Sequence, residues 1–136
     1  MALVVADRVK ETTTLTGSSN NINLGGAFTS FSTFASQMSN NDTTYYNIED
    51  TSGGFEIGIG TYNSSSNEIA RTTILKSSNS NNAVNWSSGT KTVFMTIPAD
   101  KFFYKDANGN NLSIDAKATK GFATAMAIAL APFKDF

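Results

Sequence analysis

The sequence contains neither cysteine nor histidine, and each absence excludes a class of chemistry. Without cysteine the chain has no disulfides and no thiol nucleophile, and without either residue it lacks the usual ligands of a zinc site. Mechanisms that need an imidazole as general base are excluded as well. The redox compartment stays open, because it is read from cysteine usage. We therefore expect no enzyme, no cofactor and no metal.

Charge and long apolar runs are also scarce. Charged residues make up only 15% of the 136 positions, against about 25% in an average protein. A net charge of −1 gives no whole-chain attraction to nucleic acid or to acidic membranes. The apolar runs at 2–5 and 123–131 are too short for a signal peptide and for a spanning helix of about 20 residues, respectively. We expect a soluble chain without nucleic-acid or membrane partners.

The composition that remains favours β-structure. Serine, threonine and asparagine supply 48 residues, yet 40% of the chain is hydrophobic and it holds 10 Phe, 4 Tyr and 1 Trp. That aromatic content argues against disorder, because aromatic side chains bury the largest areas. Threonine also favours strands. We expect an ordered, neutral, β-rich domain.

Short β-type segments recur at intervals of about 8 to 14 residues with polar turns between them, as in an antiparallel sandwich or barrel. The fold class predicted is therefore all-β, with a barrel-like or sandwich domain and a short C-terminal helix. The predicted strands are Val9–Thr16, Ile22–Leu24, Thr43–Glu49, Phe55–Tyr62, Glu68–Ser77, Val84–Trp86 and Thr92–Ile97.

Three local patterns qualify this prediction. The first two segments flank a Gly/Ser/Asn cluster at 17–21, which suggests a hairpin. The segment Ala27–Phe34 fits either a strand or one irregular helical turn. Gly58 and Gly60 alternate within a strand, which indicates a close backbone approach or a bulge.

The C-terminal part differs in composition. Asn108-Gly109 between two apolar runs predicts a hairpin, and the alanine-rich segment 116–131 predicts a helix that Pro132 ends. We assign one domain over 1–136, made of a β-module at 1–100 and a hairpin-plus-helix segment at 101–136. The helix could dock on its own core or on another subunit. We expect an assembly element, with its candidate interface at Phe122, Met126, Leu130, Phe133 and Phe136.

Charge is divided unevenly between the two halves. Residues 1–68 carry a net charge of −5, and residues 69–136 carry +4. Scattered surface charge is one interpretation, and complementary packing between neighbouring copies is the other.

Several residue patterns imitate functional sites and are better explained by structure. Glu49, Asp50 and Glu56 flank one hairpin as an acid/base pair would, but turns favour Asp. Lys76 and Ser77 are adjacent in a strand and should point to opposite faces, which opposes a catalytic dyad.

Two further patterns concern metal and nucleic acid. Residues 106–110 start like a calcium-binding loop, but Asn111 and Lys117 stand where that loop needs Gly and Glu. The stretch Lys101–Lys105 combines lysines with aromatics as a base-stacking surface would, yet packing explains it better at this net charge.

Beside this reading, the opening residues 2–11, ALVVADRVKE, with the threonines after them, resemble the start of a group of tailed-bacteriophage virion proteins. The resemblance covers roughly residues 1–100, where it implies a β-module of tail, tail-fibre or other structural proteins. It continues through TTYY at 43–46, FEIGIGTY at 55–62, ART at 70–72, LKSSN at 75–79, NWSSGTK at 85–91 and the strand at 93–99.

The resemblance implies a tail or tail-fibre component that assembles in multiple copies. It further implies other virion proteins as partners and a place in the virion after synthesis in the host cytoplasm. One alternative is a capsid decoration or head-fibre protein. A second, from another class, is a carbohydrate-binding module in which Trp86 and Tyr62, with Tyr45 and Tyr46, stack on sugar rings, although Trp86 also fits a core position.

Overall fold

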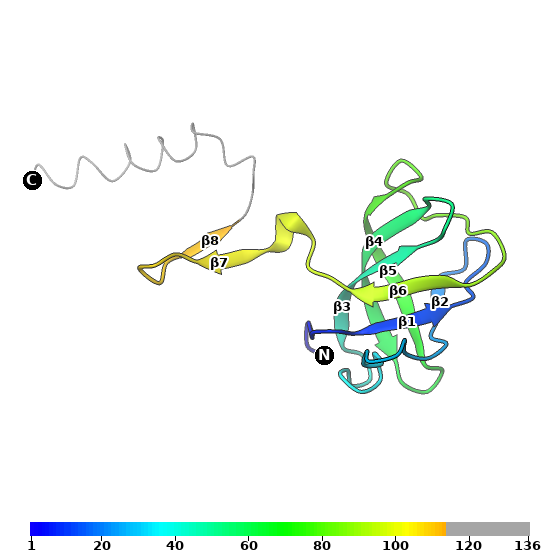
Figure 1. Ribbon diagram of the computed structural model, residues 1–136, viewed down its shortest axis with the longest axis horizontal. Helices are drawn as coiled ribbons and strands as arrows, with labels where there is room; N and C mark the ends of the chain where they lie inside the picture. Colours follow the sequence, from blue (N-terminus) through cyan, green and yellow to red (C-terminus); the bar gives the residue numbers. More distant parts are fainter. Residues whose placement is uncertain (114–136) are drawn as a thin grey trace, which may run out of the picture. The chain divides into compact units, whose positions relative to one another are not determined.

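The computed structural model describes residues 1–113 and separates the chain into two compact units, with the boundary between Ile97 and Pro98 (Figure 1). The helix predicted over 116–131 lies outside the described residues. So do the candidate interface residues Phe122, Met126, Leu130, Phe133 and Phe136. Those predictions stay predictions.

Six strands build the first unit into one antiparallel sheet with the order β1-β6-β3-β4-β5-β2. Its central hairpin pairs β3 with β4 in register from Thr43–Thr61 to Glu49–Phe55. The predicted all-β, barrel-like class is confirmed. The strands are β1 (Lys10–Thr13), β2 (Asn21–Asn23), β3 (Thr43–Glu49), β4 (Phe55–Asn63), β5 (Glu68–Ser77) and β6 (Lys91–Met95).

The two edge strands, β1 and β2, are joined by the segment that follows β2. The backbone N–H of Gly25 donates to the carbonyl oxygen of Thr12 at 2.8 Å. The N–H of Thr12 donates to the carbonyl oxygen of Gly26 at 3.0 Å. The Asn23 side-chain amide donates to the Thr14 hydroxyl at 2.7 Å. These bonds nearly close the sheet into a barrel, which covers edges that would otherwise accept another strand.

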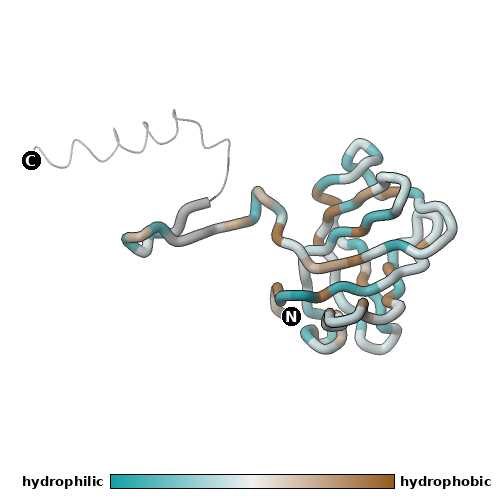
Figure 2. Tube along the Cα trace, viewed as in Figure 1, coloured by the Kyte–Doolittle hydropathy of each residue, from teal (hydrophilic) through white to brown (hydrophobic). Residues whose placement is uncertain are grey.

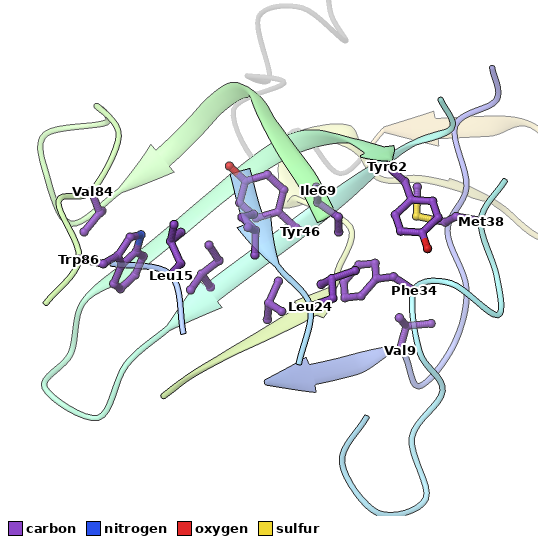
Figure 3. Close-up of a cluster of buried hydrophobic side chains, with 13 residues drawn as sticks. Val9, Leu15, Leu24, Phe34, Met38, Tyr46, Tyr62, Ile69, Val84 and Trp86 are labelled. Atoms are coloured by element: carbon purple, nitrogen blue, oxygen red, sulfur yellow. The ribbon is translucent and has the colours of Figure 1, made fainter. Parts of the chain in front are cut away.

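A single hydrophobic cluster fills the barrel interior (Figure 3). Its members come from strands β2 to β6, from the residues that flank β1 and from the loops between the strands. Burying one large apolar side chain contributes about 1.5–3 kcal/mol. Figure 2 shows the loops of the barrel as mostly neutral to hydrophilic, as their Ser/Thr/Asn content requires. The cluster comprises Val9, Leu15, Ile22, Leu24, Phe34, Met38, Tyr46, Ile48, Tyr62, Ile69, Val84, Trp86 and Val93.

Strand β4 turns a carboxylate and two glycines toward the barrel interior. Its inward positions include Glu56, Gly58 and Gly60, whereas Ile57 and Ile59 are half-buried on the outer face. The interior can hold a carboxylate only because a cation lies opposite it, as described below. Large apolar side chains are thereby left on the outside of the barrel.

The prediction for the two strand glycines is confirmed on both counts. A Cβ atom at Gly58 would lie 2.5 Å from the Tyr46 hydroxyl oxygen and 2.6 Å from the carbonyl oxygen of Thr73. At Gly60 it would collide with the side chain of Ile69. The register between β4 and β5 also shifts at both glycines, which marks bulges.

The hairpin predicted between residues 9–16 and 22–24 is wrong. Strand β1 pairs with β6 and β2 pairs with β5, so the two strands lie at opposite ends of the sheet order. Gly17, inside the expected turn, instead exchanges two backbone hydrogen bonds with Trp86, at 2.7 and 2.9 Å. The strand predicted over 84–86 is reduced to this single bridge.

The ambiguous segment 27–34 is a loop with one tight turn. The N–H of Phe31 donates to the carbonyl oxygen of Phe28 at 2.9 Å, and Ser30 has a left-handed φ of 66°. The buried carboxylate of Glu11 accepts the N–H of Gly26 at 3.1 Å and that of Phe34 at 2.7 Å. One strand side chain therefore fixes both ends of the loop.

The described part of the second unit consists of η1 (Ala99–Lys101), β7 (Phe103–Lys105) and β8 (Asn111–Ser113). Strands β7 and β8 pair antiparallel, which confirms the predicted hairpin. The Asp106 carboxylate accepts the backbone N–H groups of Asn108 and Asn110, each at 2.9 Å. Hydrogen bonds from the Asn110 side chain and then its backbone lower the pKa of Asp106, so the residues that imitate a calcium loop cap a turn.

Candidate interaction site

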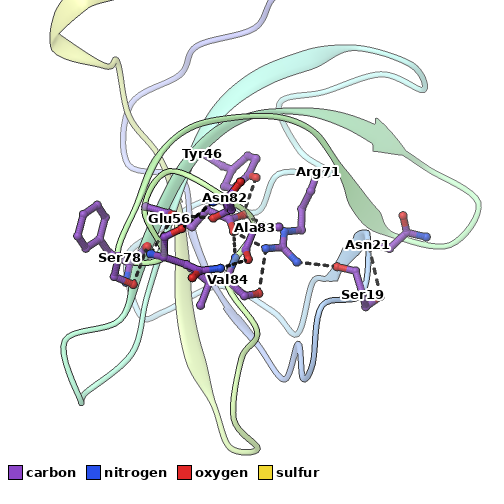
Figure 4. A network of polar contacts seen from close by, with 12 residues as sticks. Ser19, Asn21, Tyr46, Glu56, Arg71, Ser78, Asn82, Ala83 and Val84 are labelled. Atoms are coloured by element: carbon purple, nitrogen blue, oxygen red, sulfur yellow. Dashed lines mark hydrogen bonds and ion pairs between the residues drawn. The ribbon is translucent and has the colours of Figure 1, made fainter.

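A buried ion pair crosses the barrel interior between β4 and β5 (Figure 4). The Arg71 guanidinium donates through Nε and Nη2 to the Glu56 carboxylate, with an Nε–Oε1 distance of 2.8 Å. The same carboxylate accepts the Tyr46 hydroxyl and the backbone N–H of Val84, each at 2.8 Å. Its hydrogen-bonding capacity is therefore filled by groups of the barrel itself.

Arg71 also anchors two loops. Its Nη1 donates to the carbonyl oxygen of Ser19 at 2.8 Å, and its Nη2 donates to that of Val84 at 3.1 Å. Burial, together with the Glu56 carboxylate, raises the pKa of the Tyr46 hydroxyl. Desolvation opposes the charge of Arg71, but the hydrogen bond and the charge of Glu56 outweigh it and raise the pKa of the guanidinium. The cluster therefore links β4, β5 and two loops and stabilises the barrel.

The three carboxylates weighed as an acid/base pair are separated in space. Glu56 is fully buried, while Glu49 lies on the outer face of β3. Asp50 accepts the Ser52 hydroxyl and the Gly54 N–H, each at 2.8 Å, and the Ser52 N–H at 2.9 Å, which stabilises the turn. The Ser52 hydroxyl and then the Gly54 N–H lower the pKa of the Asp50 carboxyl. The structure thus does not bring the three carboxylates together, and Glu56 and Asp50 are engaged within the fold. Lys76 and Ser77 also have opposite exposure, as their alternation requires.

The aromatic residues proposed for sugar stacking are buried. Trp86 and Tyr62 are each 3% exposed in the core, and Tyr46 is fully buried, so none of them presents a ring face to a ligand. The Tyr62 hydroxyl donates to Asn67 Oδ1 at 3.0 Å, and burial raises its pKa. Of that set only Tyr45 keeps partial exposure. The glycan contacts predicted at Trp86 and Tyr62 are therefore corrected to core packing.

The outer surface carries a groove of about 340 Å³ where the start of β1, the end of β6 and the loop after Phe28 come together. We call it the cation groove, because two cationic side chains and four apolar ones line it together with a single carboxylate. Its lining residues are Arg8, Val9, Lys10, Phe31, Glu49, Phe94 and Met95.

Aromatic rings position both cations of the groove. The Arg8 guanidinium lies 4.5 Å from the centre of the Phe31 ring. The Lys10 ammonium lies 4.9 Å from the ring centre of Phe28, 5.6 Å from that of Phe31 and 6.0 Å from that of Phe94. Such cation–π contacts contribute about 0.5–1 kcal/mol each at exposed sites. The groove is thus formed before any partner arrives.

Arg8 is held in place at a cost in backbone strain. It adopts a left-handed φ of 58°, which is unusual for a residue with a side chain. Its Nε and Nη2 both donate to the carbonyl oxygen of Ser30, at 3.1 and 2.8 Å. Strain of this kind costs about 1–3 kcal/mol and is concentrated at functional sites. Within residues 1–113, neither Arg8 nor Lys10 forms an ion pair with a carboxylate.

Sequence reasoning did not identify this groove. Arg8 and Lys10 stand two residues apart at the start of β1, which is the one local signal available. Their aromatic partners come from residues 28–31 and 94, and pairing segments so far apart needs the sheet order.

Among residues 1–113, no group of His, Cys, Asp and Glu side chains is placed to hold a metal ion. A search of the same residues for a helix long and apolar enough to cross a membrane finds none.

Comparison with known proteins gives no relative. No protein-family model matches the chain, and neither a curated protein nor a solved structure matches it. The function of the chain is therefore inferred from its residues and from the resemblance of residues 1–100 to phage virion proteins.

Proposed function

We propose that the chain is a non-enzymatic structural protein of a tailed-bacteriophage virion. It is built into the tail or its fibres in multiple copies and contacts other virion proteins. The observation that carries this proposal is the resemblance of residues 1–100 to phage virion β-modules. The first compact unit of the structure ends at Ile97, close to where that resemblance ends.

The outer face of the barrel supports a role in assembly. A continuous row of paired positions runs across four strands, from Lys10 to Phe94, Asn47 and Ile57. Two members of this row are large and apolar, and Ile59 lies on the same face of β4. A structural subunit buries such outer positions against its neighbours.

Exposed apolar side chains at the start and end of the first unit also support a role in assembly. Leu3 is 56% exposed, Val5 45% and Ile97 41%. Val4, between the first two, packs against the core, and its N–H donates to the carbonyl oxygen of Thr43 at 2.8 Å. The backbone of this segment is thus fixed while its outward side chains stay available to a neighbouring subunit.

Mass spectrometry of purified particles tests the proposal. The phage that encodes the chain should contain it as a constituent that survives high-salt washing. Gold-labelled antibody against the barrel should then mark the tail. Label on the head surface would instead favour the decoration-protein alternative. Absence of the chain from washed particles would contradict both.

A further inference from the structure

We propose that the cation groove of one copy binds residues 132–136, Pro-Phe-Lys-Asp-Phe, of a second copy. This inference rests on the proposed function, because it assigns the contact by which copies of the chain associate. The occupant lies outside the described residues, so the argument uses its sequence and the geometry of the groove.

The groove offers hydrogen-bond donors to an anion. The Nε and Nη2 of Arg8 donate to the carbonyl oxygen of Ser30, whereas its Nη1 makes no hydrogen bond within residues 1–113. The ammonium of Lys10 is placed over aromatic rings and has no oxygen partner in that range. Both cations therefore stay available to a carboxylate, and an ion pair in a partly apolar groove is stronger than one in open solvent.

Five of the eleven carboxylate side chains are already engaged within the fold. Glu11, Asp42 and Glu56 are buried and hydrogen-bonded. Asp50 and Asp106 cap their own turns. These five cannot serve as free ligands for the groove.

Asp135 has sequence neighbours that suit the groove lining. It is the acidic residue of the chain that has a phenylalanine within two positions on each side, Phe133 and Phe136. Lys134 stands next to it, and the groove has Glu49 beside its two cations. The sequence thus matches the lining group for group: anion to cations, cation to carboxylate and aromatic rings to the apolar wall.

A second copy is the source of this segment, because the proposed function requires repeated self-contact. The contact joins two different surfaces, so it is heterologous, and such contacts generate rings or open filaments.

Charge-reversal variants of the full chain test the proposal. Sedimentation velocity would measure self-association of the wild type, Lys10→Glu, Asp135→Lys and the double variant. Each single variant should weaken association by at least about tenfold, and the double variant should restore it. Thermal unfolding of each protein checks the fold, and Asp135 is not part of the described barrel. If Lys10→Glu weakened association only by removing the cation–π contacts of Lys10, adding Asp135→Lys would not restore association.

Two matched variants serve as controls. Lys76→Glu makes the same change on an exposed residue of β5 that is not part of the groove lining, and Asp100→Lys does so at an exposed aspartate. Both should associate like the wild type. A wild type that stays monomeric, single variants that associate normally, or a double variant without restored association would each overturn the proposal.

The result separates this inference from the proposed function. If the chain is a particle constituent but the variants associate like the wild type, the groove assignment fails and the virion role stands. If the charge reversals behave as expected but the chain is absent from particles, the self-contact stands and the virion role fails.

Discussion

Replacing Glu56 by glutamine tests the interior ion pair, which we regard as the main fastening of the barrel. The substitution conserves volume but removes the charge that neutralises Arg71. It also leaves two of the carboxylate's four donors without an acceptor, because two donors reach each carboxylate oxygen and an amide offers a single oxygen. Breaking a buried ion pair from one side costs about 3–5 kcal/mol, a large share of the 5–15 kcal/mol typical of a whole domain.

Urea denaturation followed by the fluorescence of Trp86 provides the assay, because this residue is the single tryptophan and lies in the core. With a slope of about 1.5 kcal/mol per molar urea, the midpoint should fall by about 2–3 M. Glu49→Gln makes the same chemical change on the exposed outer face and should shift the free energy of unfolding by less than about 0.5 kcal/mol.

A double variant separates charge from packing. Adding Arg71→Met to Glu56→Gln removes the unpaired cation, so part of the lost stability should return. If Glu56→Gln unfolds at the same urea concentration as Glu49→Gln, the ion pair does not hold the barrel together and the reasoning is refuted.

Three further predictions concern packing and pH. Gly58→Ala should destabilise the barrel by about 1–3 kcal/mol in the same urea assay, because its Cβ would meet the Tyr46 hydroxyl and a backbone carbonyl; an unchanged midpoint would contradict the close approach. Trp86→Ala should cost about 3–5 kcal/mol by thermal unfolding, and an unchanged melting temperature would contradict its core role. Backbone N–H groups of Ser39 and Ala2 lower the pKa of Asp42 below its ordinary 3.8, so its contribution to stability is present above that pH and is lost as pH falls through the lower folded-state value. Melting temperatures between pH 5 and pH 2 should therefore fall less steeply for Asp42→Asn than for the wild type, and parallel curves would refute this.

The regular part of the fold could be predicted from the sequence. Alternation along 43–49, 55–62 and 68–77 located three strands within a residue of their observed ends, because period-two burial leaves a direct trace in sequence. Gly58 and Gly60 indicated the close approach and the bulges for the same reason.

Long-range pairing could not be predicted in this way. The bonds that join Thr12 to Gly25 and Gly26 replace the local hairpin expected for β1 and β2, and nothing in the intervening residues signals them. The burial of Glu11 and Glu56 has no local signal in the sequence, because their hydrogen-bond partners come from distant segments. The cation groove escaped detection for the same reason.

The copy number of the chain in purified particles tests the central claim most directly. Particles can be dissociated into heads and tails and each fraction quantified against an isotope-labelled standard of the chain. The proposed role predicts a fixed number of copies greater than one per particle, recovered with the tails. Recovery of the chain solely in the soluble lysate, or in amounts that vary between particle preparations, would contradict it.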